Sequence, residues 1–270
     1  MKVKKYIALL IATSLLIPGM SLAERLVLKG STTVLPIAQK VSEAYMKMNP
    51  DVKISLSGGG SSNGIKAIID GTTDIGNASR FIKGKEVKLA VTKGVYPVPH
   101  RIALDCIVPV VHKSNGVSNL TVKQLRNIYL GKIRNWSEVG GANKRIVVIS
   151  RDSSSGTYDA WKSLVMKKKR VVPSALTVPS NGGLVQAISN TKGAVGYIAL
   201  GYVTKTIKTL KVEGIRGSEK TTKQGVYPIS RPLYMFTKSW PKGKTLDFIN
   251  YILSVKGQKL VKSVGSIPLY

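Results

Sequence analysis

The sequence predicts an α/β protein built from two lobes, and three observations support this prediction. Short runs rich in β-branched residues alternate with segments whose apolar residues recur at helical spacing, which is the pattern of an α/β fold. Two long apolar runs flank a segment that has its own alternation of strands and helices. Polar turns rich in glycine, serine and threonine follow several of the predicted strands.

The first third of the chain contains three predicted strands. Arg25–Lys29 is the first, and a helix with regularly spaced apolar residues follows over residues 37–48. Val52–Leu56 is the second strand, and another helix begins at Ile65. A third short strand starts at Asp74.

Two long apolar strands organise the rest of the chain. They are predicted over Ile102–His112 and Arg231–Thr237. Between them, the strands Ile146–Ser150 and Ala194–Ile198 alternate with helical patterns, and a last helix begins at Thr245. Two long strands on either side of an inserted α/β unit predict two lobes joined by two crossings.

The lobe boundaries follow from these crossings. Residues 24–105 together with 229–270 are expected to form lobe one, and residues 106–228 lobe two. Ligands of two-lobed proteins bind in the cleft between the lobes, where closure can bury them. We therefore expect the binding site in the interlobe cleft.

The N-terminal residues predict a cleaved signal peptide. Three lysines precede an apolar run over Tyr6–Met20, and Ser21–Ala23 has the small residues that signal peptidase requires. A membrane anchor is the weaker interpretation, because the run is shorter than a spanning helix and contains Pro18. We expect residues 1–23 to be removed and the mature protein to lie in the periplasm.

The charge of the chain is strongly positive. Lys and Arg number 42 against 13 Asp and Glu, which gives a formal net charge of +29 and a pI of about 10.2. Such a surface attracts anions without specifying which anion, so a binder of nucleic acid or another polyanion is the alternative hypothesis. Aromatic residues make up only 6%, whereas nucleic-acid surfaces usually interleave basic and stacking residues. The dense basic run Lys167–Arg170 is typical of a solvated helix end.

The residues needed for catalysis are not grouped in the sequence. His100 and His112 have no carboxylate at metal-ligand spacing, and the serine-rich turn after Asp152 has no histidine partner for a triad. Cys106 is the only cysteine, so an intrachain disulfide is impossible, and its apolar setting predicts a buried thiol. A phosphatase is therefore disfavoured, and we expect no enzyme activity, no metal and no cofactor.

Three strand-to-helix turns carry the chemistry that points to a ligand. They are Gly30–Thr33, Gly60–Gly64 and Ser153–Thr157. A helix N-terminus has unpaired N–H groups and partial positive charge, and glycine and hydroxyl residues there form a cradle for an anion. Serine and threonine are also ordinary helix caps, but these turns offer two to four hydroxyls each, and a cap needs one. Arg151 heads the third turn and can bind an oxyanion through paired hydrogen bonds, unless Asp152 neutralises it.

A fourth polar segment, Ser79–Arg80, ends the third predicted strand. It can supply another donor pair, but a solvent-facing arginine before a helix is an equally good interpretation of the spacing.

These motifs together resemble a known family. The chain is similar to the periplasmic phosphate-binding subunit of the high-affinity phosphate ABC transporter, in its short bacterial form. The matching segments span almost the whole mature chain and are Gly30–Ile37, Gly58–Ile65, Asp74–Arg80, Ile102–Ile107, Ile133–Trp136, Arg151–Thr157 and Gly193–Tyr197. The resemblance implies a type II periplasmic binding protein fold and inorganic phosphate as the ligand. It also implies an inner-membrane permease and ATPase complex as partner, and we expect a monomer that does not bind nucleic acid.

The resemblance also implies a set of ligand-binding residues. The residues it carries over are Thr32, Thr33, Val34, Ser61, Arg151, Ser155, Gly156 and Thr157. The turns and strand ends themselves add Ser31, Ser79, Arg80 and Asp105 to the expected phosphate shell. Arg80 departs from the family pattern, because longer relatives have there an aspartate that accepts a proton from the ligand. Asp105, in the first crossing strand, is the candidate replacement, although a water-facing strand-end residue is the alternative interpretation. A buried carboxylate would accept the proton of hydrogen phosphate and repel sulfate, which carries none.

Overall fold

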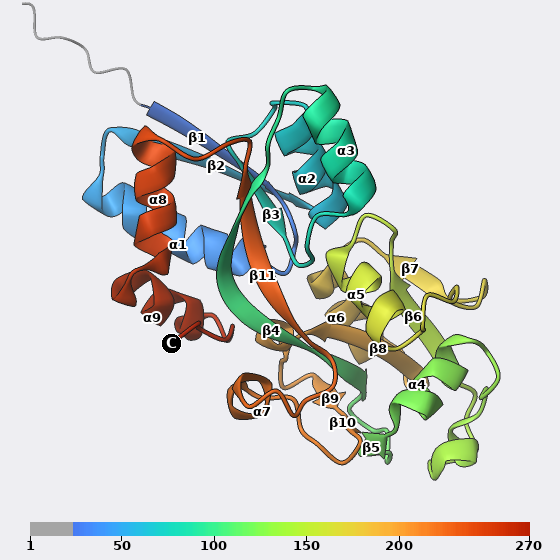
Figure 1. Ribbon diagram of the computed structural model, residues 1–270. Helices are drawn as coiled ribbons and strands as arrows, with labels where there is room; N and C mark the ends of the chain where they lie inside the picture. Colours follow the sequence, from blue (N-terminus) through green and yellow to red (C-terminus); the bar gives the residue numbers. More distant parts are fainter. Residues whose placement is uncertain (1–23) are drawn as a thin grey trace, which may run out of the picture.

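The computed structural model describes residues 24–270, so the predicted signal peptide lies outside the described residues. The α/β fold with two lobes is confirmed (Figure 1). The elements of the first part of the chain are β1 (Glu24–Gly30), α1 (Leu35–Met48), β2 (Val52–Gly59), α2 (Ser61–Ile69), β3 (Ile75–Ala78), α3 (Gly84–Thr92) and β4 (Val98–His112). The inserted part contains β5 (Asn119–Leu120), α4 (Val122–Tyr129), β6 (Val147–Arg151), α5 (Gly156–Leu164), β7 (Leu176–Val178), α6 (Asn181–Asn190), β8 (Ala194–Ala199), β9 (Ile207–Thr209), β10 (Lys211–Val212) and α7 (Glu219–Lys223). The chain returns through β11 (Ser230–Thr237) and ends with α8 (Gly243–Leu253) and α9 (Val255–Ser263).

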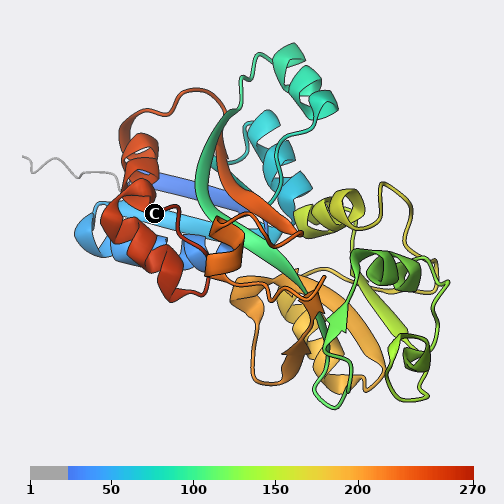
Figure 2. The ribbon, with the colours of Figure 1, turned by 60° about the horizontal axis from the view of Figure 1, so that its bottom comes forward.

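One curled sheet runs through both lobes. Within residues 24–270 it has nine strands, in the order β2-β1-β3-β11-β4-β8-β6-β7, with β9 paired to β4. β1 lies parallel to β2 and β3, whereas β11 lies antiparallel to both β3 and β4. β4 is the shared strand, because its first part pairs with β11 and its last part, from Ile107 onward, pairs with β8. Figure 2 shows β4 and β11 running side by side from one lobe toward the other.

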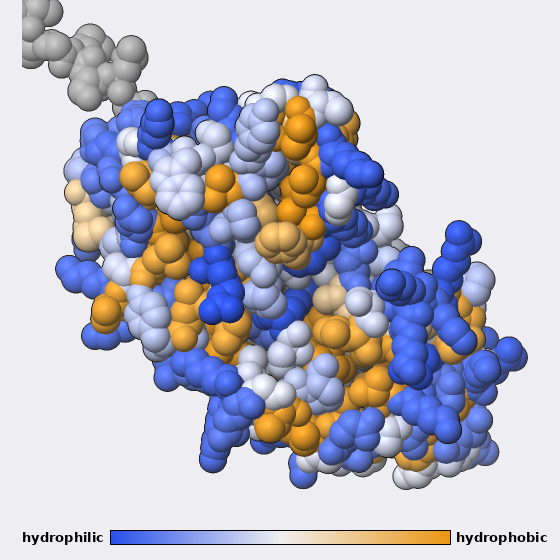
Figure 3. All heavy atoms as spheres, viewed as in Figure 1, coloured by the Kyte–Doolittle hydropathy of each residue, from blue (hydrophilic) through white to orange (hydrophobic). Residues whose placement is uncertain are grey.

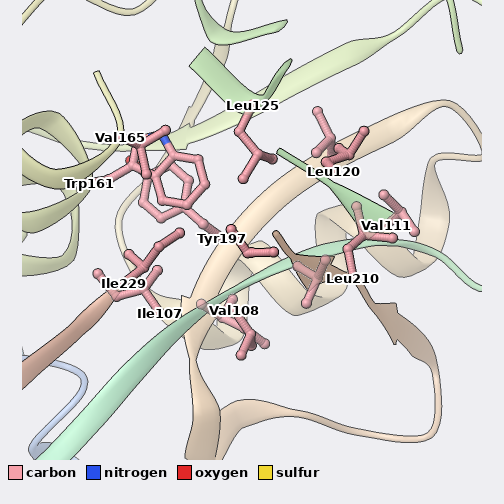
Figure 4. Packing of buried hydrophobic residues seen from close by; sticks show 14 of the residues in the cluster. Ile107, Val108, Val111, Leu120, Leu125, Trp161, Val165, Tyr197, Leu210 and Ile229 are labelled. Carbon is pink, nitrogen blue, oxygen red and sulfur yellow. The ribbon is translucent and has the colours of Figure 1, made fainter. Parts of the chain in front are cut away.

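The hydrophobic cores are separate. One cluster of buried residues draws on β1, α1, α8 and the start of β4, and a small satellite packs beneath α2 and α3. The other cluster begins at Cys106 and fills the inserted part, where the rings of Trp161 and Tyr197 stack with their centroids 4.3 Å apart (Figure 4). Ile229 and Ile267 also pack in this second cluster, so the C-terminal segment contributes a side chain to both cores. The two cores correspond to the two lobes, and the crossing strands connect them.

Three helical features differ from the sequence prediction. The last predicted helix is divided into α8 and α9 at Ser254, whose hydroxyl accepts a hydrogen bond from the N–H of Gly257 and so caps the second helix. The bounds of α3 were not predicted, because its apolar residues Val87, Leu89 and Val91 remain exposed and do not form one buried face. The five-residue helix α7 was not predicted at all.

The surface is mostly polar. Figure 3 shows hydrophilic residues over both lobes in the view of Figure 1, with apolar residues interspersed. The basic run Lys167–Arg170 is exposed, as predicted, and lies two residues beyond the end of α5. Across residues 24–270, none of the helices combines the length and the apolar character needed to cross a membrane.

Candidate functional site

The three predicted turns meet between the lobes. The Thr33 hydroxyl from the turn before α1 lies 3.2 Å from the Thr157 hydroxyl at the start of α5. Gly156 comes so close to the second turn that a Cβ on it would lie 2.3 Å from the Ser61 Oγ. α1 and α2 belong to lobe one and α5 to lobe two, so the site lies at the junction of the lobes, as predicted.

Most of the hydroxyl residues of these turns are removed from solvent. Ser31, Thr32, Thr33, Ser61, Ser155 and Thr157 are each at most 8% exposed. The Ser155 hydroxyl caps α5 by accepting from the N–H of Tyr158, whereas the Ser31 hydroxyl accepts from the N–H of Thr33 within the first turn. The helix starting at Gly156 and the one starting at Ser61 both direct their N-termini into this cluster, which therefore has the donors and the positive potential that suit an anion.

Arg151 lies at the end of β6 with its guanidinium buried. It donates from Nη2 to the carbonyl of Pro179 at 2.9 Å and to the Thr32 hydroxyl at 3.3 Å. Its Nη1 is buried and has no hydrogen-bond partner among residues 24–270. Burial lowers the pKa of Arg151, and the nearby charge of Asp152 opposes this effect. The Asp152 carboxylate accepts hydrogen bonds from Ser154 instead of pairing with Arg151, so the guanidinium keeps its capacity to bind an anion.

A second buried arginine, Arg231, lies in the same cluster, and the sequence analysis did not identify it. Arg231 lies in β11 directly opposite Asp105 in β4, and its Nε and Nη2 donate to one carboxylate oxygen of Asp105 at 3.0 and 2.8 Å. Nη2 also donates to the Thr157 hydroxyl at 3.0 Å. Burial lowers the pKa of Arg231, whereas the adjacent Asp105 raises it. Its position at the inner end of a predicted crossing strand, facing an acidic residue in the other crossing strand, was the signal that could have identified it.

Asp105 is only 3% exposed, so the interpretation as a water-facing residue is wrong. One of its carboxylate oxygens is bonded to Arg231, and the other accepts from the N–H of Leu200 at 3.1 Å. Burial raises the pKa of Asp105, and Arg231 opposes that shift. These contacts show that Asp105 holds Arg231 in place. Its role as acceptor of a ligand proton stays a prediction.

Asn181 is the other residue that the sequence analysis missed. It is the first residue of α6, is completely buried, and donates from Nδ2 to the hydroxyls of Thr32 and Thr33 at 3.3 and 3.1 Å. The preceding Ser180 caps α6 by accepting from the N–H of Gly183. The polar segment Ser180–Gly183 is thus a fourth strand-to-helix turn, and its composition was a signal like that of the other three.

Ser79 lies inside the hydroxyl cluster, whereas the Arg80 side chain lies among carboxylates outside it. The Ser79 hydroxyl lies 3.2 Å from that of Ser61, inside the cluster. The Arg80 guanidinium is buried, so it does not face solvent, and it is bonded to carboxylates. Its Nη1 and Nη2 donate to Glu86 at 2.8 and 2.7 Å, and its Nε lies 2.8 Å from a carboxylate oxygen of Asp159. Burial would raise the pKa of Glu86, but the hydrogen bonds from Arg80 and from the N–H of Lys83 outweigh it and hold that pKa below its usual value.

Asp159 belongs to α5 of lobe two, so its contacts with Arg80 and Lys83 join the two lobes. Lys83 Nζ lies 2.7 Å from the same carboxylate oxygen. We refer to Arg80, Lys83, Glu86 and Asp159 as the interlobe ion cluster. A backbone hydrogen bond of 3.0 Å from Ser62 to Ser154 also connects the lobes. The structure therefore shows the lobes in contact around the hydroxyl cluster, which corresponds to a closed arrangement.

Val34 directly follows the first turn, whereas the remaining reactive groups are separate from this site. Val34 is buried at the N-cap of α1, and its N–H lies 3.2 Å from the carbonyl oxygen of Ser31. Cys106 is buried as predicted, and burial raises the pKa of its thiol to about 12, so it is a poor nucleophile. Residues 24–270 contain no group of three or more His, Cys, Asp or Glu side chains arranged to hold a metal ion.

The two-lobed sheet and the buried polar site between the lobes define a solute-binding protein, and comparison with known proteins agrees. A family profile described as a PBP superfamily domain matches residues 20–256. The phosphate-binding protein PstS of Bacillus subtilis is 30% identical over 246 residues, which cover 90% of this chain and 80% of the relative. The PstS of Pseudomonas aeruginosa is 31% identical over 264 residues, covering 89% of this chain and 81% of the relative. The chain belongs to this PstS family of phosphate-binding proteins within the PBP superfamily.

Solved structures show the same similarity. A phosphate ABC transporter substrate-binding protein from Clostridium perfringens, crystallised with bound phosphate, superimposes with a TM-score of 0.85 at 34% identity and covers 92% of this chain and all of the other. An ABC-type phosphate transport receptor from Vibrio cholerae gives a TM-score of 0.74 at 31% identity, covering 90% of this chain and 99% of the other.

Proposed function

We propose that this protein binds inorganic phosphate between its lobes and delivers it to an ABC transporter. The observation that carries the proposal is the buried Nη1 of Arg151, which has no partner in residues 24–270 and lies beside a cluster of buried hydroxyls. A buried guanidinium nitrogen without a partner is costly, and a bound oxyanion would supply the missing acceptor. The PstS relatives and the phosphate-bound neighbour support phosphate as that oxyanion.

The proposed phosphate shell uses the converging turns. Arg151 and the hydroxyls of Thr32, Ser61 and Thr157 would bind the oxygens of phosphate, and the first N–H groups of α5 would add further donors. Arg231 would support the shell from the side of Asp105. Gly156 is predicted to contribute its backbone N–H, and Ser31 and Ser79 are predicted to hold their neighbours in place. The N–H groups of Val34 and Ser155, which were also predicted to bind, are bonded here to the carbonyls of Ser31 and Asp152, so they would have to exchange these partners for phosphate. Arg80 would act through the interlobe ion cluster rather than as a ligand.

The biological setting is part of the same proposal. Binding proteins of this family lie outside the cytoplasmic membrane, and we propose that the chain reaches the periplasm through residues 1–23 as a cleaved signal peptide. Its partners would be the permease and ATPase subunits of a phosphate transporter, and it would work as a monomer without catalytic activity. No finding favours the alternative of a nucleic-acid or polyanion binder.

Titration calorimetry tests the proposal directly. We expect phosphate to bind with micromolar or tighter affinity and with weak dependence on salt, because the contacts are buried and short. Sulfate and double-stranded DNA serve as comparison ligands. Heat with DNA that falls steeply with salt, together with no heat from phosphate, would replace this proposal with the polyanion binder.

The interlobe ion cluster leads to a prediction about closure. Asp159 provides the carboxylate that Arg80 and Lys83 share across the lobes, and opening would separate these charges. Asp159→Asn should therefore weaken phosphate binding by about three- to tenfold, which is about 0.7–1.4 kcal/mol and is reasonable for a partly buried ion pair. The loss should appear as faster dissociation and should shrink as salt is raised.

Asp247→Asn is the matched control for that variant. Asp247 is exposed on α8 and forms no ion pair within residues 24–270, so the same charge change there should leave phosphate affinity unaltered. Stopped-flow dissociation measured for both variants gives the comparison. Equal dissociation rates in the two variants would show that the interlobe ion cluster does not stabilise the closed arrangement.

A further inference from the structure

The orientation of the Asn181 amide follows from its hydrogen bonds. One side of the amide lies 3.2 Å from the backbone N–H of Ala199, which can only donate. The amide oxygen must therefore face Ala199, and the NH₂ group must face the opposite way. On that side lie the hydroxyl oxygens of Thr32 and Thr33, 3.3 and 3.1 Å from Nδ2. The NH₂ group has two hydrogens, so it can donate to both hydroxyls at once.

Each of these two hydroxyls also receives a hydrogen bond from an arginine. Arg151 Nη2 donates to Thr32 at 3.3 Å, and Arg231 Nη2 donates to Thr33 at 3.3 Å. Amide NH₂ and guanidinium groups donate and cannot accept. A hydroxyl oxygen has two lone pairs, so two such donors occupy its whole capacity to accept. The only hydrogen-bonding capacity that remains to each threonine is its own O–H.

The same count assigns the direction of the contact between Thr33 and Thr157. Since Thr33 already accepts twice, its O–H donates across the 3.2 Å contact to Thr157. Thr157 also accepts from Arg231 Nη2 at 3.0 Å. One of the two hydrogens of Nη2 goes to Asp105, so Thr33 and Thr157 share the other in a three-centre hydrogen bond. Both lone pairs of Thr157 are then occupied, and its proton must point to a group that is not part of this network. Thr32 and Thr157 thus each have one O–H left to offer, and neither can accept.

We infer that Asn181 is a positioning residue that makes this face of the site donate only, and that the phosphate oxygens bound there are unprotonated. The inference rests on the proposed function and adds to it which oxygens of the bound phosphate carry no proton. Asn181 touches the threonines rather than the ligand, and it acts by fixing the direction of their protons. The proton of hydrogen phosphate must then lie on an oxygen that faces another part of the site.

Exchanging the amide for a carboxylate reverses this arrangement with little change of shape. In Asn181→Asp, one carboxylate oxygen still accepts from Ala199, but the other accepts from the threonines and draws their protons away from the ligand. The variant also puts a negative charge beside the bound anion. One additional proton, on the new carboxyl group or on the phosphate, would again provide a hydrogen-bond donor on this side of the ligand. Binding by the variant should therefore take up as much as one more proton than binding by the wild type.

The experiment measures the phosphate dissociation constant of wild type and Asn181→Asp by calorimetry between pH 5 and pH 8. At pH 8 we expect the variant to bind at least about a hundredfold more weakly than the wild type. The ratio of the two constants should narrow as the pH falls, by up to about tenfold per pH unit if one full proton is taken up. Measuring the wild type at every pH corrects for the ionisation of phosphate itself.

Two further variants complete the test. Asn190→Asp makes the same charge change at the exposed C-terminal end of α6 and should bind as the wild type does. Asn181→Ala removes the amide donors without adding an acceptor. Its phosphate affinity should be about tenfold below that of the wild type, by the same factor at every pH. It also carries the test if Asn181→Asp does not fold.

The outcomes are distinct. A folded Asn181→Asp with affinity within about threefold of wild type at pH 8 would overturn the inference, and so would a deficit that is constant from pH 5 to pH 8. Unchanged binding by Asn181→Ala would overturn it as well. Failure of the proposed function has a different signature, because wild-type protein would then give no heat with phosphate.

Discussion

Arg151→Met should reduce phosphate affinity by about 10²- to 10⁴-fold. The guanidinium is buried at the site, and its Nη1 has no partner within residues 24–270, so the bound anion is expected to receive two charged hydrogen bonds from it. Hydrogen bonds to charged groups contribute roughly 1.5–3 kcal/mol each, and methionine keeps the aliphatic stem while removing both. Calorimetry with phosphate measures the loss.

Two companion variants sharpen this expectation. Arg151→Lys keeps the charge but cannot form the paired geometry, and it should bind at an intermediate level. Arg134→Met removes an arginine whose Nε is bonded to a carbonyl at the surface of the same lobe, and it should bind like wild type. If Arg151→Met kept its affinity within tenfold of wild type, the phosphate site would have to be placed elsewhere.

Gly156→Ala should weaken phosphate binding at least a hundredfold by preventing closure. A Cβ at this first residue of α5 would lie 2.3 Å from the Ser61 Oγ and 2.9 Å from its Cβ, and 2.7 Å from the Ser79 Oγ. Both serines belong to lobe one, so the clash arises only when the lobes come together. The open protein can avoid it, and alanine suits the helix, so the thermal stability measured without phosphate should be nearly unchanged.

Small-angle scattering distinguishes this cause from a simple loss of contacts. Wild type should become more compact on adding phosphate, whereas Gly156→Ala should keep the radius of gyration of the unliganded protein. Gly84→Ala is the matched control, because Gly84 also begins a helix and a Cβ there would have no neighbour within 4 Å. Compaction of Gly156→Ala to the same extent as wild type would show that the site tolerates the methyl group.

The sequence predicted the features that depend on local patterns. The apolar runs identified both crossing strands, since strands buried on both faces are nearly continuous in apolar residues. The three hydroxyl-rich turns were recognised because the serine, threonine and glycine residues that begin helices can be identified from the local sequence. Arg151 was found because it precedes one of these turns along the chain.

The residues that were missed depend on long-range pairing. Arg231 reaches the site only because β11 pairs with β4 in a register that puts it opposite Asp105, and register is not encoded by either strand alone. Asp159 meets Arg80 only when the lobes are in contact. Asn181 begins a helix whose apolar periodicity was recognised, but the connection of its amide to the hydroxyls of another lobe was not visible in the pattern.

The position of β11 in the sheet has a consequence for how the site is assembled. β11 lies between β3 and β4 in the sheet, although the inserted elements from β5 to α7 separate it from both strands in the sequence. The second lobe is nearly complete in one continuous segment, whereas the first must recruit the C-terminal part of the chain to close its sheet. Arg231 arrives with that same strand. A fragment that ends before residue 230 could therefore contain all three hydroxyl turns and Arg151 and still lack a finished site.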